Sequence, residues 1–189
     1  MMPAYISGIV LLSTYIKTKW IRYQLVFSLA VHLVLAVEVL FYPVLIKSDD
    51  TWVGWQTLAD QVKQLQRRYP NTFIFSADDY KTSAVLNFYL DEMVYAKNVI
   101  GERALQFDYI GTNLGALKGK DALFIDSRPR DLTLAHTKNE LPRTLPGYFD
   151  SIKELPPIII MQNNRITRKF LVYYCTNYKV NHRALASYP

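Results

Sequence analysis

The sequence predicts an α/β protein in two parts: one full and one partial transmembrane helix, then a three-layer α/β extracytoplasmic domain with a C-terminal antiparallel β extension. Three observations predict it. Residues 1–46 are strongly apolar and hold only four charged side chains, whereas residues 47–189 have the composition of an ordinary soluble domain. Helix-like and strand-like segments alternate over 54–127. Strand-like runs alone then follow over 148–179.

The full transmembrane helix is expected over residues 25–46. These 22 residues would form a helix about 33 Å long, which exceeds a hydrocarbon layer of about 30 Å. Only His32 and Glu38 are ionisable within it. A buried helix of a small domain would show a polar face, and a signal peptide would end in a small-residue cleavage site. This segment shows neither pattern, so a membrane span is favoured over both.

The partial helix is expected over residues 1–16, which are apolar but would make only about 24 Å of helix. The segment 17–24, KTKWIRYQ, is expected to be the loop of a transmembrane hairpin over 1–46. Its three bases place it on the cytoplasmic side, so residues 47–189 are expected outside the cytoplasm. The first helix of the hairpin is then truncated, and the chain is expected to be the C-terminal end of a larger membrane protein.

The domain is expected to begin with alternating helices and strands, as in a largely parallel sheet with helices on its faces. Its elements, in chain order, are a helix over 54–70, a strand over 72–77, a helix over 80–91, a strand over 93–96, a turn with a short helix over 111–119 and a strand over 121–127. In the first helix Leu58, Val62 and Leu65 recur at helical spacing. The residues of the second helix that are expected to face inward are Ala84, Val85, Phe88 and Tyr89.

Residues 128–147 are expected to form a surface loop, since they contain three prolines and many charges. Three strands are expected afterwards, over 148–156, 157–162 and 168–179. Asn163 to Arg165 is the expected hairpin turn, because asparagine tolerates the left-handed backbone conformation. These strands are the antiparallel extension of the fold.

Composition and motifs exclude several function classes. The net charge is +6 and the isoelectric point is near 9.3, but the bases are scattered along the chain, so no nucleic-acid partner is expected. The glycine-rich segment 111–121 lacks the spacing of a P-loop and of a dinucleotide-binding fingerprint. The sequence has no HExxH or CxxC motif, and no metal ligands are assigned. The single cysteine, Cys175, is expected to be a buried small hydrophobic residue.

Five phrases carry a resemblance to a known family. They are 49-DDTWVGWQTLADQV-62, 76-SADDYKTSAVLNFYL-90, 95-YAKNVIGERALQFDYI-110, 119-GKDALFID-126 and 149-FDSIKELPPIIIMQNNRITRKFLVYYC-175. In their order and spacing they resemble the C-terminal extracytoplasmic region of bacterial membrane glycosyltransferases of the GT-C type. The group is protein-mannosyltransferase-like and includes relatives of the lipid A aminoarabinose transferase. The resemblance covers most of residues 50–175 and the helix before them.

The resemblance implies an enzyme of the inner (cytoplasmic) membrane that transfers a sugar from a polyprenyl-phosphate carrier to a lipid, glycan or protein acceptor. Such a reaction needs a carboxylate to activate the acceptor hydroxyl, and a cation or metal to assist the departing phosphate. In the family the carboxylate usually lies in the first external loop, far toward the N-terminus. This sequence lacks that part. The chain is therefore expected to be inactive alone and to cap the active site.

The resemblance also implies partners. They are membrane lipid, the polyprenyl-phosphate sugar donor and the remaining transmembrane part of the enzyme. No cofactor is expected in this chain, and a divalent metal is expected only as a possible component of the full-length enzyme.

No catalytic residue is identified, but six candidate substrate-binding residues are. They are Asp50, Trp55, Tyr80, Arg103, Gln106 and Asp108. Asp50 follows the transmembrane helix on the side where the reaction would occur. Arg103 and Asp108 flank Gln106 and are candidates to contact carrier phosphate or sugar hydroxyls. Structural alternatives remain: a solvated helix end for Asp50, an interfacial anchor for Trp55, and an ion pair between Arg103 and Asp108.

Two other functions stay open. The chain is alternatively a non-catalytic membrane-tethered binding module, in which case residues 47–189 have a ligand pocket of their own. It is alternatively a subunit of a split transferase, in which case the apolar faces of residues 1–46 need a partner in the membrane.

Overall fold

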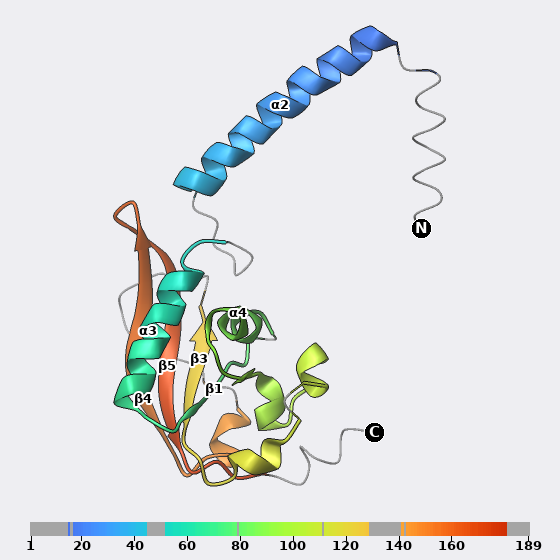
Figure 1. The fold of residues 1–189 in the computed structure, drawn as a ribbon. Helices are drawn as coiled ribbons and strands as arrows, with labels where there is room; N and C mark the ends of the chain where they lie inside the picture. Colours follow the sequence, from blue (N-terminus) through green and yellow to red (C-terminus); the bar gives the residue numbers. More distant parts are fainter. Residues whose placement is uncertain are drawn as a thin grey trace. The chain divides into compact units, whose positions relative to one another are not determined.

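The computed structural model describes residues 15, 17–44, 52–78, 80–110, 112–128, 141 and 143–180 (Figure 1). The chain divides into two compact units, Met1–Leu45 and Ile46–Pro189. The first unit contains the helix α2, and the second contains a mixed sheet with helices. The predicted α/β fold class is confirmed for the second unit.

Helix α2, Thr18–Phe41, is long and apolar enough to cross a membrane. Its 24 residues give a length of about 36 Å, and its most apolar 18-residue window has a mean hydropathy of 2.1. A membrane span and a signal sequence both have such properties. The helix ends before residue 46, where the predicted span ends, because Tyr42 adopts a left-handed conformation with a φ of 47° directly before Pro43.

The start of α2 corrects one expectation. Residues 17–24 are predicted as a loop, but the helix begins at Thr18. The segment contains no glycine or proline, and its lysine, arginine and glutamine residues are good helix formers, so nothing in it breaks the helix. The partial helix predicted over 1–16 lies outside the described residues, apart from Tyr15, which is helical.

The sheet of the second unit has five strands in the order β2-β1-β3-β5-β4. The strands are β1 Phe73–Phe75, β2 Val94–Tyr95, β3 Ala122–Ser127, β4 Ser151–Gln162 and β5 Arg165–Thr176. Strand β1 runs parallel to both β2 and β3, whereas β5 runs antiparallel to both β3 and β4. The expected antiparallel extension therefore belongs to the same sheet, and only β2, β1 and β3 fit the expectation of a parallel one.

Two predicted strands, 148–156 and 157–162, form the single strand β4. Its pairing with β5 shifts in register between Leu155 and Ile158, across Pro156–Pro157. Proline has no amide hydrogen for the ladder, so the pair is tolerated as a bulge in a strand at the edge of the sheet. The prolines therefore interrupt the pairing without ending the strand.

The hairpin turn between β4 and β5 is confirmed. Asn163 and Asn164 have φ values of 48° and 62°, the left-handed values that a two-residue type I′ turn requires. The surface loop predicted over 128–147 lies mostly outside the described residues. At its described end, 143–147, four of the five residues are exposed, as a surface loop requires. Leu145 is the exception, because it is fully buried in the short 3-10 helix η4, Leu145–Gly147.

The sheet is covered on both faces (Figure 1). The helices α3, Trp55–Arg68, and α4, Lys81–Tyr89, pack on the face that includes Ile74, Leu123 and Val172. The short 3-10 helices η1, Lys97–Ile100, η3, Leu114–Leu117, and η4 pack on the opposite face, which includes Phe75, Phe124 and Tyr173. Successive strand residues point to opposite faces, as the pleat requires. The second unit thus has three layers, one of them made of 3-10 helices and loops.

Helix α4 turns a different face to the sheet than the sequence predicts. Its buried residues are Thr82, Ser83 and Leu86. Phe88 is 82% exposed and Tyr89 is 37% exposed, so the prediction that both face inward is wrong.

Hydrogen bonds to the edge strand β2 explain this orientation of α4. The Ser83 hydroxyl donates to the Tyr95 carbonyl at 2.6 Å, and Asn87 Nδ2 donates to the Val94 carbonyl at 2.7 Å. The Val94 amide donates in turn to Asn87 Oδ1 at 3.0 Å. Because β2 is short and lies at the edge of the sheet, its backbone groups take these side chains as partners. Polar residues therefore face the sheet where an apolar stripe was expected.

A tyrosine–aspartate hydrogen bond ties the end of β5 to the start of β3. The Tyr174 hydroxyl donates to Asp121 Oδ2, and the Asn177 amide donates to Asp121 Oδ1 at 2.9 Å. The Tyr174 ring also packs on Tyr69, with ring centroids 4.7 Å apart. The hydrogen bond to Asp121 raises the pKa of Tyr174 to about 12, and burial acts in the same direction.

We expect the stabilising effect of the Tyr174 hydroxyl to disappear at high pH. Its folded-state pKa is about 12, whereas the ordinary value is 10.0, so between these values the folded state binds more protons than the unfolded state. The advantage of the wild type over Tyr174→Phe in free energy of unfolding should be complete below pH 10 and should be lost as the pH rises toward 12. Urea unfolding of the full chain in detergent, at neutral pH and through this interval, measures the difference. A difference that does not change with pH contradicts the assignment.

Candidate functional site

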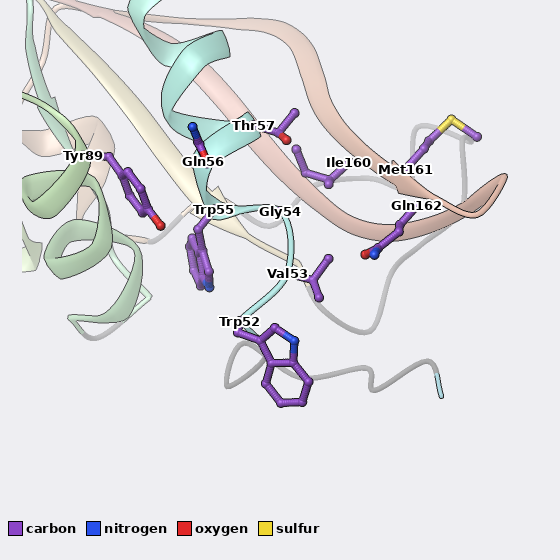
Figure 2. Close-up of a pocket in the computed structure, with 10 residues that line it drawn as sticks. All are labelled: Trp52, Val53, Gly54, Trp55, Gln56, Thr57, Tyr89, Ile160, Met161 and Gln162. Atoms are coloured by element: carbon purple, nitrogen blue, oxygen red, sulfur yellow. The ribbon is translucent and has the colours of Figure 1, made fainter. Parts of the chain in front are cut away.

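A pocket of about 360 Å³ opens at the N-terminal end of α3 (Figure 2). Three segments form it: the turn into α3, the end of α4, and the part of β4 that precedes the hairpin turn. The lining residues are Trp52, Val53, Gly54, Trp55, Gln56, Thr57, Tyr89, Ile160, Met161 and Gln162. All of them belong to the second unit, so the pocket is a property of the α/β domain itself.

The turn at Gly54 brings the start of α3 against β4. Gly54 has a φ of 84°, and a Cβ atom in its place would lie 2.6 Å from Ile160 Cγ2. Glycine fits both this backbone conformation and this space, which a side chain would not. The Gly54 carbonyl accepts a hydrogen bond from the Leu58 amide at 3.0 Å and so opens the helix. The turn therefore fixes where α3 begins and how closely it approaches β4.

Trp55 forms the inner wall of the pocket. Its side chain is only 7% exposed, and its ring packs on Phe170 of β5 with ring centroids 5.7 Å apart. The guanidinium carbon of Arg168, itself a buried residue, lies 3.6 Å from the centroid of the Trp55 ring. This is a cation–π distance. Contacts with two residues of β5 hold the indole in place, so the wall exists before any ligand arrives.

Two further aromatic rings lie at the mouth of the pocket. Trp52 is 47% exposed and Tyr89 is 37% exposed. Figure 2 shows Tyr89, Trp55 and Trp52 toward one side of the pocket, and the β4 residues Ile160 to Gln162 toward the other. A molecule in the pocket would therefore have aromatic surface on one side and the β4 edge strand on the other.

Gln162 supplies a buried hydrogen-bond acceptor. Its Oε1 atom is shielded from solvent and has no hydrogen-bond partner among the described residues. Figure 2 shows its amide directed toward Val53, across the pocket. A buried acceptor without a donor costs about 1–3 kcal/mol. A donor group that enters the pocket would recover this cost.

The lining of the pocket is neutral. Apart from the phenol of Tyr89, none of the ten lining residues is ionisable. These ten residues offer no carboxylate or imidazole for acid–base chemistry, and no lysine or arginine for a phosphate. Aromatic rings with amide and hydroxyl groups suit the binding of a neutral polar molecule.

Of the six candidate residues, Trp55 lines this pocket. Its side chain is buried in the domain core. An interfacial anchor, the alternative role for Trp55, would be exposed. Asp50 lies outside the described residues. Tyr80 is half-buried and packs on a small apolar cluster that includes Ala104 and Phe107.

Of the other three candidates, Gln106 and Asp108 belong to the short 3-10 helix η2, Leu105–Asp108, and Arg103 lies just before it. Arg103 and Gln106 are exposed, and the Asp108 carboxylate accepts a hydrogen bond from the Ala104 amide at 2.8 Å. Since Phe107 contacts the cluster on which Tyr80 packs, the fold brings Tyr80 and this turn together. None of these four residues lines the pocket at α3. The hydrogen bond to Ala104 gives Asp108 a structural role in the turn.

Sequence reasoning missed the contributions of Trp52, Tyr89 and Gln162. Tyr89 is predicted in the core because it falls on an apolar stripe of its helix, and Trp52 is not among the six candidate residues. The phrase WVGW contains the available signal, because a glycine between tryptophans at a helix start permits a close turn with aromatic rings around it. For Gln162 the sequence holds no comparable signal.

The carboxyl ends of parallel strands are a second place where α/β folds bind ligands. After β1, the Ser76 hydroxyl donates to Asp78 Oδ1 at 2.5 Å, and the Thr82 hydroxyl donates to Asp78 Oδ2. These bonds tie the strand to the start of α4, which is a structural task. Among the described residues, no three His, Cys, Asp or Glu side chains gather as a metal ion would require. The divalent metal of a full-length enzyme stays a prediction.

No protein-family model, no curated protein and no solved structure matches this chain. The resemblance to membrane glycosyltransferases therefore depends on the five sequence phrases alone. The apolar helix and the pocket are the structural features that bear on function.

Replacing Gly54 by alanine is expected to lower the free energy of unfolding by about 2–4 kcal/mol, because the new Cβ strains the backbone and displaces Ile160. Gly147→Ala is the matched control, since a Cβ at Gly147 meets no described heavy atom within 4 Å. Chemical denaturation of the full chain in detergent compares the two variants. Equal stabilities would show that the approach of the turn to β4 is not a tight constraint.

Proposed function

We propose that the chain is the membrane-tethered C-terminal portion of a glycosyltransferase that uses a polyprenyl-phosphate sugar and modifies a lipid, glycan or protein acceptor. Its α/β domain caps the active site and does not supply the catalytic base. The observation that carries this proposal is the neutral, aromatic pocket in a domain whose chain continues from α2.

The composition of α2 supports a place in the inner membrane. Its length and hydropathy suit a span, and three bases lie at its N-terminal end, in 17–24. Trp20 and Tyr23 lie in the same segment, and these residue types favour the membrane–water interface. The positive-inside rule favours a cytoplasmic position for the basic end, and this supports an extracytoplasmic α/β domain.

The chemistry of the pocket supports a binding role for the domain. Sugar transfer needs a base for the acceptor hydroxyl and positive charge for the leaving phosphate, and the pocket lining has neither a carboxylate nor a cationic side chain. Those groups, and any divalent metal, then belong to the remaining transmembrane part of the enzyme. The domain contributes affinity and shape beside a reaction that other residues perform.

A membrane-tethered binding module without a catalytic partner is the second candidate. It is favoured by the position of the pocket, which lies wholly within the second unit. A subunit of a split transferase differs from this module because it needs a partner in the membrane. Measurement of carrier-linked sugar distinguishes the binding module from a transferase portion and from a split-transferase subunit, because only the latter two take part in sugar transfer.

The side of the membrane is tested with one introduced cysteine. Cys175 is fully buried, and burial raises its pKa to about 12, so the wild-type chain should not react with a membrane-impermeant maleimide. Lys118 is exposed, and Lys118→Cys should be labelled in intact spheroplasts. Labelling that occurs only after lysis would place the domain in the cytoplasm and contradict the proposal.

Loss of the chain is expected to change a pool of carrier-linked sugar. In cells that lack its gene, one polyprenyl-phosphate sugar should accumulate and one acceptor should lose a sugar, because transfer stops. Mass spectrometry of lipid extracts and of envelope components measures both quantities. Complementation with the full chain should restore them. Unchanged pools would exclude a role in transfer and leave the binding module.

A further inference from the structure

We propose that the pocket at the start of α3 binds a neutral glycosyl unit and discriminates against sugars whose ring carries an ammonium, carboxylate or phosphate group. The inference rests on the proposed function and names the class of sugar that its domain recognises. Three properties of the pocket carry it: its charge, its surface chemistry and its unsatisfied acceptor.

The described lining offers no oppositely charged side chain to an ionised ligand of either sign. Among the described lining residues an anionic group would find no lysine, arginine or histidine, and a cationic group would find no carboxylate. Tryptophan faces can hold a cation, but the Trp55 ring already carries the Arg168 guanidinium at 3.6 Å. A second cation on the same ring would be repelled by that guanidinium. A charged sugar would therefore be desolvated without compensation.

The surface chemistry matches a pyranose ring. Such a ring has apolar C–H faces and an equator of hydroxyl groups. Trp52 and Tyr89 present exposed aromatic surface, and the amides of Gln56 and Gln162 with the Thr57 hydroxyl present donors and acceptors. The volume of about 360 Å³ is at the lower end of the range for small-molecule sites, about 300–1,000 Å³. One or two sugar rings fit that size.

The Gln162 carbonyl oxygen identifies the kind of group that completes the pocket. It is a buried acceptor without a described partner, so it needs a donor. A sugar hydroxyl donates one hydrogen bond and can accept another from a neighbouring amide or hydroxyl. A phosphate or carboxylate oxygen would face this acceptor with its own lone pairs and would be repelled. At its carbonyl oxygen the Gln162 side chain therefore favours a hydroxyl over an anionic oxygen.

Binding of defined glycosides to the full chain in nanodiscs tests the inference. The neutral probes are methyl mannoside and methyl glucoside, and the charged probes are methyl glucosaminide, methyl glucuronide and inorganic phosphate. Ligand-observed NMR and calorimetry measure the affinities. We expect a neutral glycoside to bind, with each charged probe weaker by on the order of tenfold or more.

Matched variants locate the binding site. Trp52→Ala and Gln162→Leu should each weaken the neutral glycoside by on the order of tenfold. Tyr109→Ala and Gln64→Leu are the controls, because they remove an exposed tyrosine and an exposed glutamine outside the pocket and should leave affinity unchanged. Gln162→Leu removes a buried unsatisfied acceptor, so it should fold at least as stably as the wild type.

Three results would overturn the inference: no binding of any neutral glycoside, charged probes that bind as tightly, or equal effects of the pocket and control variants. Its failure is distinct from failure of the proposed function. Accumulated carrier-linked sugar in deleted cells without glycoside binding would refute the pocket assignment alone. Glycoside binding with unchanged carrier pools would refute the transferase role and keep the pocket.

Discussion

The close approach of the Gly54 turn to β4 is the constraint on which the architecture of the α/β domain depends. With no side chain at Gly54, the backbone lies against Ile160, and α3 starts from that point. Trp55, the next residue, is thereby directed onto β5, where Phe170 and Arg168 hold its ring. The same turn leaves the space in front of Trp55 unfilled by protein, and that space is the pocket. The contact of the Gly54 backbone with Ile160 thus fixes both the position of α3 and the position of the Trp55 ring in the pocket.

Periodicity predicted those parts of the fold in which apolar burial decides the orientation. The stripe of α3 packs inward as expected, with Leu58 and Val62 fully buried. The strand over 122–127 alternates between two covered faces, and its residues 122–125 are a continuous apolar run in the sequence. Where polar pairing decides, the same reasoning fails. Ser83 and Asn87 satisfy the backbone of β2, which an apolar stripe does not reveal.

The candidate site was less predictable than the fold, for a geometric reason. Trp55 could be selected from the sequence because it follows the expected membrane span closely, where an indole either stacks on a sugar or anchors the interface. Tyr89 reaches the pocket only because α4 is rotated by its hydrogen bonds to β2. Gln162 reaches it only because β4 continues past Pro156–Pro157 to the hairpin turn. Both depend on long-range pairing, which one sequence does not specify.

On the proposed function, a neutral cap has a physical advantage over a charged one. The leaving phosphate of a polyprenyl carrier must stay beside the cation or metal that stabilises it during transfer. Basic residues in a capping pocket would compete for that phosphate, and acidic residues would repel it. In this domain the Arg168 guanidinium is buried, and it lies over the rings of Trp55 and Phe170. Recognition of the sugar through aromatic surface and hydroxyl groups adds affinity. Because these contacts are neutral, they do not change the electrostatic field that the catalytic residues create at the phosphate.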